Sequence, residues 1–455
     1  MDRRIAVCIF LAALAVCAIV TKPRVLSWND GSRIATVDAL TANHSFRIDG
    51  SPYAVGLGDE IRFRGHLYSD KPPLLAVLGA GVASVAAPFG ITLRATPGTA
   101  IYLVTLLTVG VFFALGCTYA YAFQRRLGYS PRLAAAVAAS TGVGTLALPY
   151  AAVFTNHVPC GASALAGLYH IVRARDANGG RWYDTPLAGM FFALAYAFDA
   201  AGIVLALAGA IVLWGVPLRR WLIAIAAGVP VIALQVAYNV AISGSALPTV
   251  FNSGVWNDPS LPLHTWSSEM YTVYSPLAYL GFAVNLLVGA RGLFSFTPLA
   301  LVAAYGLVVM RRAGGLQPRL ALAIAATFAV YFVLIVFLQN DVGARNFGER
   351  RYVDLFFVLG IALGPALASV RTRAARIAVR LALAASVAIA ALGTVAPFAG
   401  APGESGFAFG TAEFGNLAHR APIQAGLDVV LLVLAITLVL YLVPLPARPQ
   451  QPQRA

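Results

Sequence analysis

The chain has 455 residues, of which 59% are hydrophobic and only 11% are charged. An ordinary soluble domain has about 45–50% hydrophobic and about 25% charged residues, so a water-soluble fold is excluded. The net charge of +14 would suggest a nucleic-acid partner in a soluble chain. Here, however, the basic residues lie in short clusters between hydrophobic runs, as in the cytoplasmic loops of membrane proteins. We therefore expect membrane lipids, and no nucleic acid, as partners.

The hydrophobic runs predict an all-α polytopic membrane protein. The first run, 5–20, follows a short basic N-terminus, and Lys22 and Arg24 come directly after it. We interpret it as an uncleaved signal anchor with a cytoplasmic N-terminus. Together with the later runs it predicts about twelve transmembrane helices. The later runs cover residues 99–123, 132–153, 158–173, 184–198, 199–215, 221–242, 294–310, 319–338, 353–369, 381–397 and 426–445.

The arginine clusters between these runs restrict the topology. Arg125 and Arg126, and the clusters that follow them, are cytoplasmic only if segment 72–92 does not cross the membrane completely. We therefore expect 72–92 to form an interfacial or re-entrant helix on the extracytoplasmic side, and we place 276–290 in the same way.

One membrane domain accounts for nearly the whole chain. We assign residues 1–445 to a single transmembrane domain and 446–455 to a cytoplasmic tail. Residues 21–98 form a large first extracytoplasmic loop, whose polar part is too short to bury a core of its own. Six of the 18 acidic residues lie in that polar part. Asp38, Asp49, Asp59 and Glu60 are explained equally well as surface charges, whereas Asp30 and Asp70 stand near apolar helix ends, where an unpaired charge is costly.

Two motifs in this loop resemble the first extracytoplasmic loop of the GT-C superfamily of membrane glycosyltransferases. They are Asn-Asp-Gly-Ser-Arg at 29–33 and Gly-His-Leu-Tyr-Ser-Asp-Lys-Pro-Pro-Leu at 65–74. The most similar branch comprises the aminoarabinose transferases of lipid A, the protein O-mannosyltransferases and related bacterial enzymes. Weaker similarities occur at 291–298 and 347–352. The resemblance implies the GT-C fold, with interfacial helices in the first loop.

The resemblance also implies a sugar donor linked to polyprenyl phosphate. Asp30 would be the general base that deprotonates the acceptor hydroxyl, and Lys71, one of only two lysines, would stabilise the departing phosphate. Arg33 would assist in phosphate binding. Simpler interpretations stay open, because Asp30 also suits a helix cap and Lys71 an interfacial lysine that extends to the headgroups.

Further candidates for substrate binding are Tyr68, Asp70, His157, Arg350, Arg351 and Tyr352. The paired arginines suit a phosphate clamp, although an ion pair with Glu349 explains them equally well. No cofactor is required by the sequence. A divalent metal held by Asp70 with His66 or His157 is compatible with the residue types, but no spacing enforces it.

The predicted function is transfer of a sugar from a polyprenyl-phosphate donor to lipid A, a cell-wall glycan or a protein. The expected location is the bacterial inner membrane, with the active site facing the periplasm or exterior. One alternative is a secondary transporter, which would place its ionisable residues at mid-membrane in repeated halves. A second alternative is a ligase or polymerase of lipid-linked glycans, with its key arginines in a large late outer loop.

Overall fold

The computed structural model describes residues 2–175, 180–255, 258, 260, 275–289, 291–338, 346–395, 397 and 398. Their elements in chain order are α1 (Asp2–Val20), α2 (Trp28–Asn43), β1 (Glu60–Phe63), β2 (His66–Ser69), α3 (Leu74–Ala86), η1 (Ala87–Phe89), α4 (Pro97–Thr105), η2 (Leu106–Gly110), α5 (Val111–Arg126), α6 (Pro131–Val143), α7 (Ala147–Ala151), α8 (His157–Ala174), α9 (Asp184–Phe198), η3 (Ala200–Leu205), α10 (Ala206–Leu213), α11 (Leu218–Ser243), η4 (Thr249–Phe251), η5 (Ser253–Val255), α13 (Pro276–Val288), α14 (Leu293–Phe296), α15 (Leu299–Arg312), α16 (Gln317–Leu338), η6 (Arg350–Tyr352), α17 (Val353–Leu359), η7 (Gly360–Ala362), α18 (Leu363–Ser369) and α19 (Arg373–Gly393).

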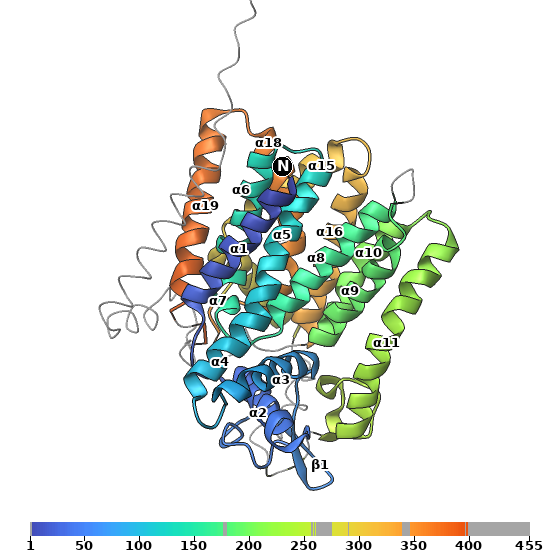
Figure 1. Cartoon of the computed structure of the whole chain (residues 1–455). Coiled ribbons are helices and arrows are strands. Elements are labelled where there is room, and N and C mark those ends of the chain that lie inside the picture. Colours follow the sequence, from blue (N-terminus) through green and yellow to red (C-terminus); the bar gives the residue numbers. More distant parts are fainter. Residues whose placement is uncertain are drawn as a thin grey trace, which may run out of the picture.

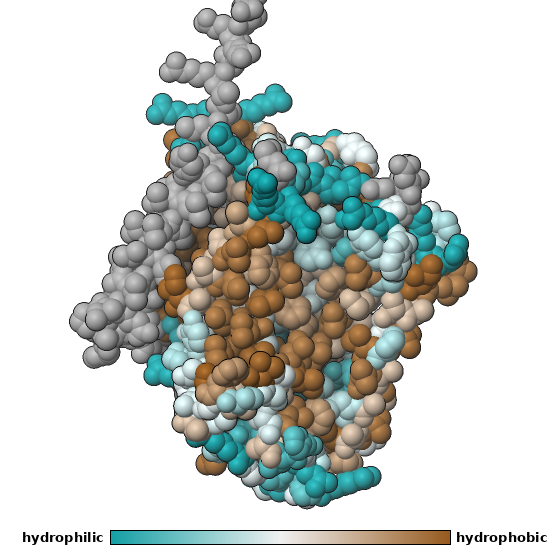
Figure 2. Space-filling model, viewed as in Figure 1, coloured by the Kyte–Doolittle hydropathy of each residue, from teal (hydrophilic) through white to brown (hydrophobic). Residues whose placement is uncertain are grey.

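The long helices pack into a bundle, and the first loop covers one end of it (Figure 1). The visible face carries a broad hydrophobic band, with hydrophilic residues gathered at both ends (Figure 2). Small residues allow close helix contacts: a Cβ atom at Gly189 of α9 would lie 1.8 Å from the backbone oxygen of Ala224 in α11. Such contacts are typical of helices that pack inside a membrane.

Within the described residues, 7 helices are long and apolar enough to cross a membrane. Other predicted spans are shorter helices: run 132–153 is divided between α6 and α7, and run 199–215 between η3 and α10. The apolar run Tyr279–Phe296 is long enough to cross a membrane. The sequence prediction had placed 276–290 in an interfacial or re-entrant helix instead. The predicted span 426–445 and the tail 446–455 lie outside the described residues.

The first loop leaves the bundle and returns to it without an additional crossing. Asp2 of α1 forms an ion pair with Arg125 near the end of α5, with a distance of 3.0 Å between Asp2 Oδ1 and Arg125 Nε. The N-terminus and the end of α5 therefore lie at the same end of the molecule. Helices α2 and α3 lie at the opposite end (Figure 1).

A β-hairpin in the first loop was not predicted by the all-α assignment. Strands β1 and β2 pair antiparallel, with Glu60 opposite Ser69 and Phe63 opposite His66. Arg64 and Gly65 connect them, and both have positive φ angles, 50° and 81°. Positive φ at both central positions is the requirement of a tight type I′ hairpin turn. The hairpin delivers the chain to Asp70 and Lys71 directly after β2.

The close helix contacts give a testable prediction at Gly306 of α15, where a Cβ atom would lie 1.9 Å from the backbone oxygen of Ala362. We expect Gly306→Ala to lower the free energy of unfolding by about 1–3 kcal/mol, because the backbones must separate. Thermal unfolding of the detergent-purified protein measures this loss. Gly81 of α3 is the matched control, since a Cβ atom there meets nothing within 4 Å. A similar loss at both positions would contradict the interpretation.

Candidate active site

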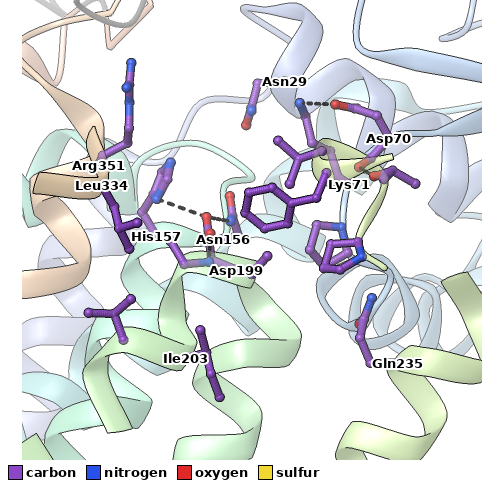
Figure 3. A pocket seen from close by; sticks show the side chains of 18 of the residues that line it. Asn29, Asp70, Lys71, Asn156, His157, Asp199, Ile203, Gln235, Leu334 and Arg351 are labelled. Carbon is purple, nitrogen blue, oxygen red and sulfur yellow. Dashed lines mark hydrogen bonds and ion pairs between the residues drawn. The ribbon is translucent and has the colours of Figure 1, made fainter. Parts of the chain in front are cut away.

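A cavity of about 250 Å³ lies between the first loop and the bundle. Its wall combines side chains from α2, α8, α11, α16 and the segment after β2 (Figure 3). The residues that give it a cationic character are Arg33, Lys71, Arg350 and Arg351. Apolar side chains such as Ile203 and Leu334 form another part of the wall. The cavity therefore suits a ligand that is anionic at one position and apolar at another.

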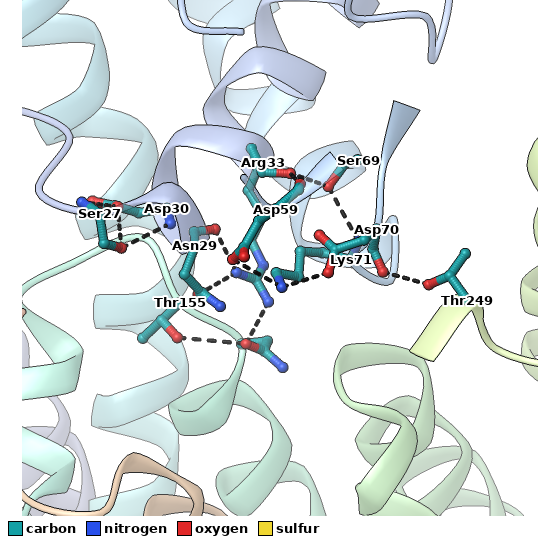
Figure 4. Close-up of polar contacts among 12 residues, drawn as sticks. Ser27, Asn29, Asp30, Arg33, Asp59, Ser69, Asp70, Lys71, Thr155 and Thr249 are labelled. Atoms are coloured by element: carbon teal, nitrogen blue, oxygen red, sulfur yellow. Dashed lines mark hydrogen bonds and ion pairs between the residues drawn. The ribbon is translucent and has the colours of Figure 1, made fainter. Parts of the chain in front are cut away.

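Lys71 is held between two carboxylates (Figure 4). Its Nζ atom lies 2.6 Å from Asp70 Oδ2 and 2.9 Å from Asp59 Oδ2. The backbone around it is also held, because Lys71 donates its N–H to Ser69 Oγ and Thr249 donates its hydroxyl to the Asp70 carbonyl. An ammonium group has three donors, and two of them are directed at these carboxylates. The side chain is therefore positioned before any ligand binds.

The two carboxylates differ in their protonation. Burial raises the pKa of Asp70, and the negative charge of Asp59 adds to the increase, while Lys71 opposes it. Burial also acts to raise the pKa of Asp59, but Lys71, Arg350 and Arg33 hold it below its usual range. Asp59 is therefore the carboxylate that stays charged opposite Lys71, whereas Asp70 takes up a proton more easily.

Arg33 connects the first loop to the bundle. Its guanidinium donates to the backbone and side-chain oxygens of Asn29, one helical turn earlier, and to Asn156 Oδ1 at 2.5 Å. Burial lowers the pKa of Arg33 to about 10, so the guanidinium stays charged at neutral pH. Asn156 in turn donates its amide to Asp199 Oδ2 at 2.5 Å. One amide side chain thus bridges a cation of the loop and a carboxylate of the bundle.

A buried histidine cluster lies next to this bridge. His157 Nδ1 lies 3.1 Å from Asp354 Oδ1 and 3.6 Å from Asp199 Oδ2. Tyr331 donates its hydroxyl to the other oxygen of Asp354. His157, Asp199 and Asp354 are also the group, among the described residues, whose ligand atoms lie within 4.8 Å of one another. The residue types and spacing are compatible with a divalent cation.

Among the described residues, the structure does not bring His66 together with Asp70 and His157, the possible metal ligands named from the sequence. His66 lies on the hairpin, where its Nδ1 atom pairs with Asp49 Oδ2 at 3.5 Å, and it does not line the cavity. Asp70 is engaged by Lys71. Of the predicted metal candidates, only His157 lies in the potential metal group, where its partners are Asp199 and Asp354.

The late arginines show the ion pair that one interpretation expected, while the phosphate clamp stays a prediction. Arg351 Nε forms an ion pair with Glu349 Oε1 at 2.8 Å, and Arg350 donates to Asn346 Oδ1 at 3.3 Å. Both arginines also line the cavity. Tyr352 is fully buried and donates its hydroxyl to the Leu286 carbonyl at 3.0 Å. Tyr352 does not line the cavity, and its predicted contact to a substrate stays a prediction.

Tyr68 also supports the site instead of lining it. It lies on β2 in a small hydrophobic cluster with Ile61 and Tyr238, and it is absent from the cavity wall. Tyr238 of the same cluster does line the cavity. Tyr68 therefore contributes to the packing of the hairpin against α11, not to the substrate-binding surface that was predicted for it.

Asp30 caps α2, and its predicted role as a general base stays a prediction. Its carboxylate accepts the N–H groups of Leu26 and Ser27 at 2.8 and 2.7 Å and the Ser27 hydroxyl at 2.7 Å. Ser27 caps α2 in return, which completes a capping box. Asp30 does not line the cavity. Its oxygens serve the start of α2, as the alternative interpretation stated.

Sequence reasoning missed several residues of the site. Asp59 was explained as a surface charge, and Asp199 and Asn156 were not proposed as site residues. Asp354 carried an overlooked signal, because it is an acidic residue inside the apolar run 353–369. An ionisable residue in a membrane helix marks a functional or paired position.

The capping role of Asp30 gives a stability prediction. Asp30→Ala leaves buried N–H groups without an acceptor, so we expect the free energy of unfolding to fall by about 1–3 kcal/mol. Asp30→Asn keeps one side-chain acceptor and should lose less. Thermal unfolding of both variants measures the difference. Loss of sugar transfer in Asp30→Asn without any loss of stability would restore the role as base.

Glu60 on β1 gives a pH prediction. Burial raises its pKa from 4.5 to about 6, with Asp49 and Asp70 adding to the increase and Arg62 opposing it. Because the pKa of Glu60 is higher in the folded state, its protonated side chain stabilises the fold below about pH 4.5. This stabilisation is lost as the pH rises through 6. Glu60→Gln should therefore melt at a higher temperature than the wild type at pH 8 and at the same temperature at pH 4. Equal melting at pH 8 would disprove this.

Comparison with known proteins identifies the fold. No protein-family model and no curated protein sequence matches the chain. Among solved structures, ArnT from Cupriavidus metallidurans bound to undecaprenyl phosphate matches with a TM-score of 0.54 and 18% identity, covering 96% of this chain and 76% of ArnT. ArnT in the apo state matches with a TM-score of 0.50 and 17% identity, over 96% and 75%. The chain therefore has the fold of ArnT, in agreement with the polytopic helical fold predicted from the sequence.

Proposed function

We propose that the protein is a membrane glycosyltransferase that moves a sugar from a polyprenyl-phosphate donor to an extracytoplasmic acceptor. The observation that carries this proposal is the cavity whose wall combines four cationic side chains with an apolar surface at the end of a membrane bundle. A polyprenyl phosphate combines the same two properties, an anionic phosphate and an apolar chain. ArnT, which has the same fold, was solved with undecaprenyl phosphate.

Lys71 is the proposed contact to the donor phosphate. Asp59 and Asp70 occupy two of its three donors and hold Nζ at the cavity wall. The remaining donor is available to a phosphate oxygen. Such a fixed cation stabilises negative charge as it develops on the departing phosphate, without the cost of reorganising water. Arg33 and Arg351 are proposed as auxiliary contacts, since guanidinium groups bind phosphate oxygens in pairs.

The proposed reaction takes place on the extracytoplasmic side. Arg125 and Arg126 end α5 at the same end of the molecule as the N-terminus. Basic clusters face the cytoplasm in membrane proteins, so the first loop and the cavity, at the other end, face outward. In a bacterial inner membrane this side meets the periplasm. A glycolipid such as lipid A, a cell-wall glycan or a protein would then supply the acceptor hydroxyl.

The test uses membrane vesicles with the full-length protein and a panel of radiolabelled undecaprenyl-phosphate sugars containing a hexose, a pentose and an amino-pentose. Membranes of the source organism supply the acceptors. We expect one donor to be consumed, and we expect Lys71→Ala to reduce its transfer by about 100- to 1,000-fold, because the phosphate loses its fixed cation.

Arg94→Ala is the matched control for Lys71→Ala. Arg94 is another cation of the first loop, paired with Asp38 at 2.9 Å, but it does not line the cavity. This variant should retain transfer per folded molecule within about twofold, because neither Arg94 nor Asp38 lines the cavity. Wild-type protein that consumes none of the donors and does not bind undecaprenyl phosphate would refute the function. Full activity of Lys71→Ala would refute only the phosphate contact.

A further inference from the structure

We propose that three arginines at the end of the bundle opposite the cavity bind the phosphate headgroup of an anionic phospholipid. They are Arg175 directly after α8, Arg220 in the first turn of α11 and Arg319 in the first turn of α16. Helix α8 begins at His157 in the cavity wall and has 18 residues. Arg175 therefore lies about 27 Å further along the bundle than the cavity. The inference does not depend on the proposed transfer reaction.

The three side chains converge on the ends of two helices. Arg175 Nη1 donates to the carbonyl of Trp214, where α10 ends, at 2.8 Å. Arg319 Nη1 donates to the same carbonyl at 2.6 Å. Arg220 donates to the carbonyl of Ala174, the last residue of α8. Helices that are far apart in the sequence thus bring three cations to one place.

The positive charge of this cluster exceeds what the helix ends can balance. The carboxyl end of a helix carries about half a negative charge, so α8 and α10 together supply about one against three guanidinium groups. In the part of the chain that the structure describes, no carboxylate pairs with any of the three arginines. Burial lowers the pKa of Arg175, and the charge of Arg319 lowers it further. A bound anion would relieve this repulsion between like charges.

Other arginines at this end of the molecule do have carboxylate partners. Arg125 pairs with Asp2, and Arg173 pairs with Asp184 at 3.2 Å. The preference for basic residues on the cytoplasmic side explains the sign of all these charges. It does not explain why three arginines gather without an acidic neighbour. Basic pockets between membrane helices on the cytoplasmic side are a type of site that binds anionic lipid headgroups.

The arginines keep hydrogen-bond donors for such a headgroup. A guanidinium has five N–H donors, and the helix-end carbonyls use only Nη1 of Arg175, Arg220 and Arg319. The other nitrogens of these side chains have no partner among the described residues, and none of them is enclosed by protein. Guanidinium groups bind phosphate oxygens in pairs, so the cluster can hold one phosphate from several sides.

The surroundings of the cluster favour a lipid over a free phosphate ion. Trp214 is 75% exposed and Leu218 is 70% exposed. Leu222 and Ile225, further along α11, are also exposed, and their spacing from Leu218 places all three on one face of the helix. Tryptophan is typical of the headgroup region of a membrane. A phosphate at the arginines and an acyl chain along α11 would occupy both parts of the site.

The experiment measures lipid binding to the purified full-length protein by native mass spectrometry. Phosphatidylglycerol is the anionic probe, phosphatidylcholine the zwitterionic probe and inorganic phosphate the competitor. We expect phosphatidylglycerol to bind more tightly than phosphatidylcholine, and Arg319→Gln to weaken its binding about fivefold, the effect of one basic residue at a membrane surface. The fold should be retained in this variant, because Arg175 still donates to the Trp214 carbonyl.

Arg132→Gln is the matched control. Arg132 is an exposed arginine in the first turn of α6, so its replacement changes the net charge equally without altering the cluster. Binding of phosphatidylglycerol to this variant should stay within about twofold of the wild type, because the attraction of a surface charge falls off over a short distance.

Three results would overturn the inference. In the first, phosphatidylglycerol and phosphatidylcholine bind equally well. In the second, Arg132→Gln and Arg319→Gln weaken binding of phosphatidylglycerol to the same extent, which indicates a response to net charge alone. In the third, millimolar inorganic phosphate displaces phosphatidylglycerol, which shows that the arginines take the free ion and that the acyl chain adds nothing.

Discussion

A charge buried at the end of an apolar helix bundle must be paired, and Arg33 shows how this requirement shapes the protein. Arg33 is 2% exposed, so its guanidinium would be very costly without partners. Asn29 satisfies it from the same helix, and Asn156 satisfies it from the bundle. Because Asn156 also donates to Asp199, the pairing of one arginine fixes the first loop against the start of α8. The cavity exists only because these parts meet.

The need to pair buried charges also explains how the charged side chains are arranged around the cavity. Lys71 lies between Asp59 and Asp70, Arg351 pairs with Glu349, and Arg33 and Arg350 also line the wall. These side chains offer several cationic donors to an anionic ligand, which is the physical basis for proposing a lipid phosphate. The histidine cluster differs, because two acidic residues, Asp199 and Asp354, lie around one buried ring.

The helical periodicity of α2 explains why Arg33 lines the cavity and Asp30 does not. Asn29 and Arg33 are four residues apart, so they share one face of α2, and that face lines the cavity. Asp30 is one residue further along than Asn29, about 100° around a helix of 3.6 residues per turn, and it faces the helix start. The spacing Ser27 to Asp30 already contained the capping signature. The position of Lys71 could be predicted from its motif, because the hairpin before it and the prolines after it restrict the backbone over only a few residues.

The sequence by itself determined the class of the protein, the end of the bundle where polar chemistry gathers, and the non-crossing first loop. These properties depend on the length of each hydrophobic run and on the sign of the charge in each loop. Both can be evaluated segment by segment along the chain. Only the tertiary structure decided which carboxylates act together. His157 and Asp354 are separated by 197 positions, and no local spacing connects them. They meet because close packing brings α8 against α17, and a buried polar residue takes its partner from whichever helix the packing brings near.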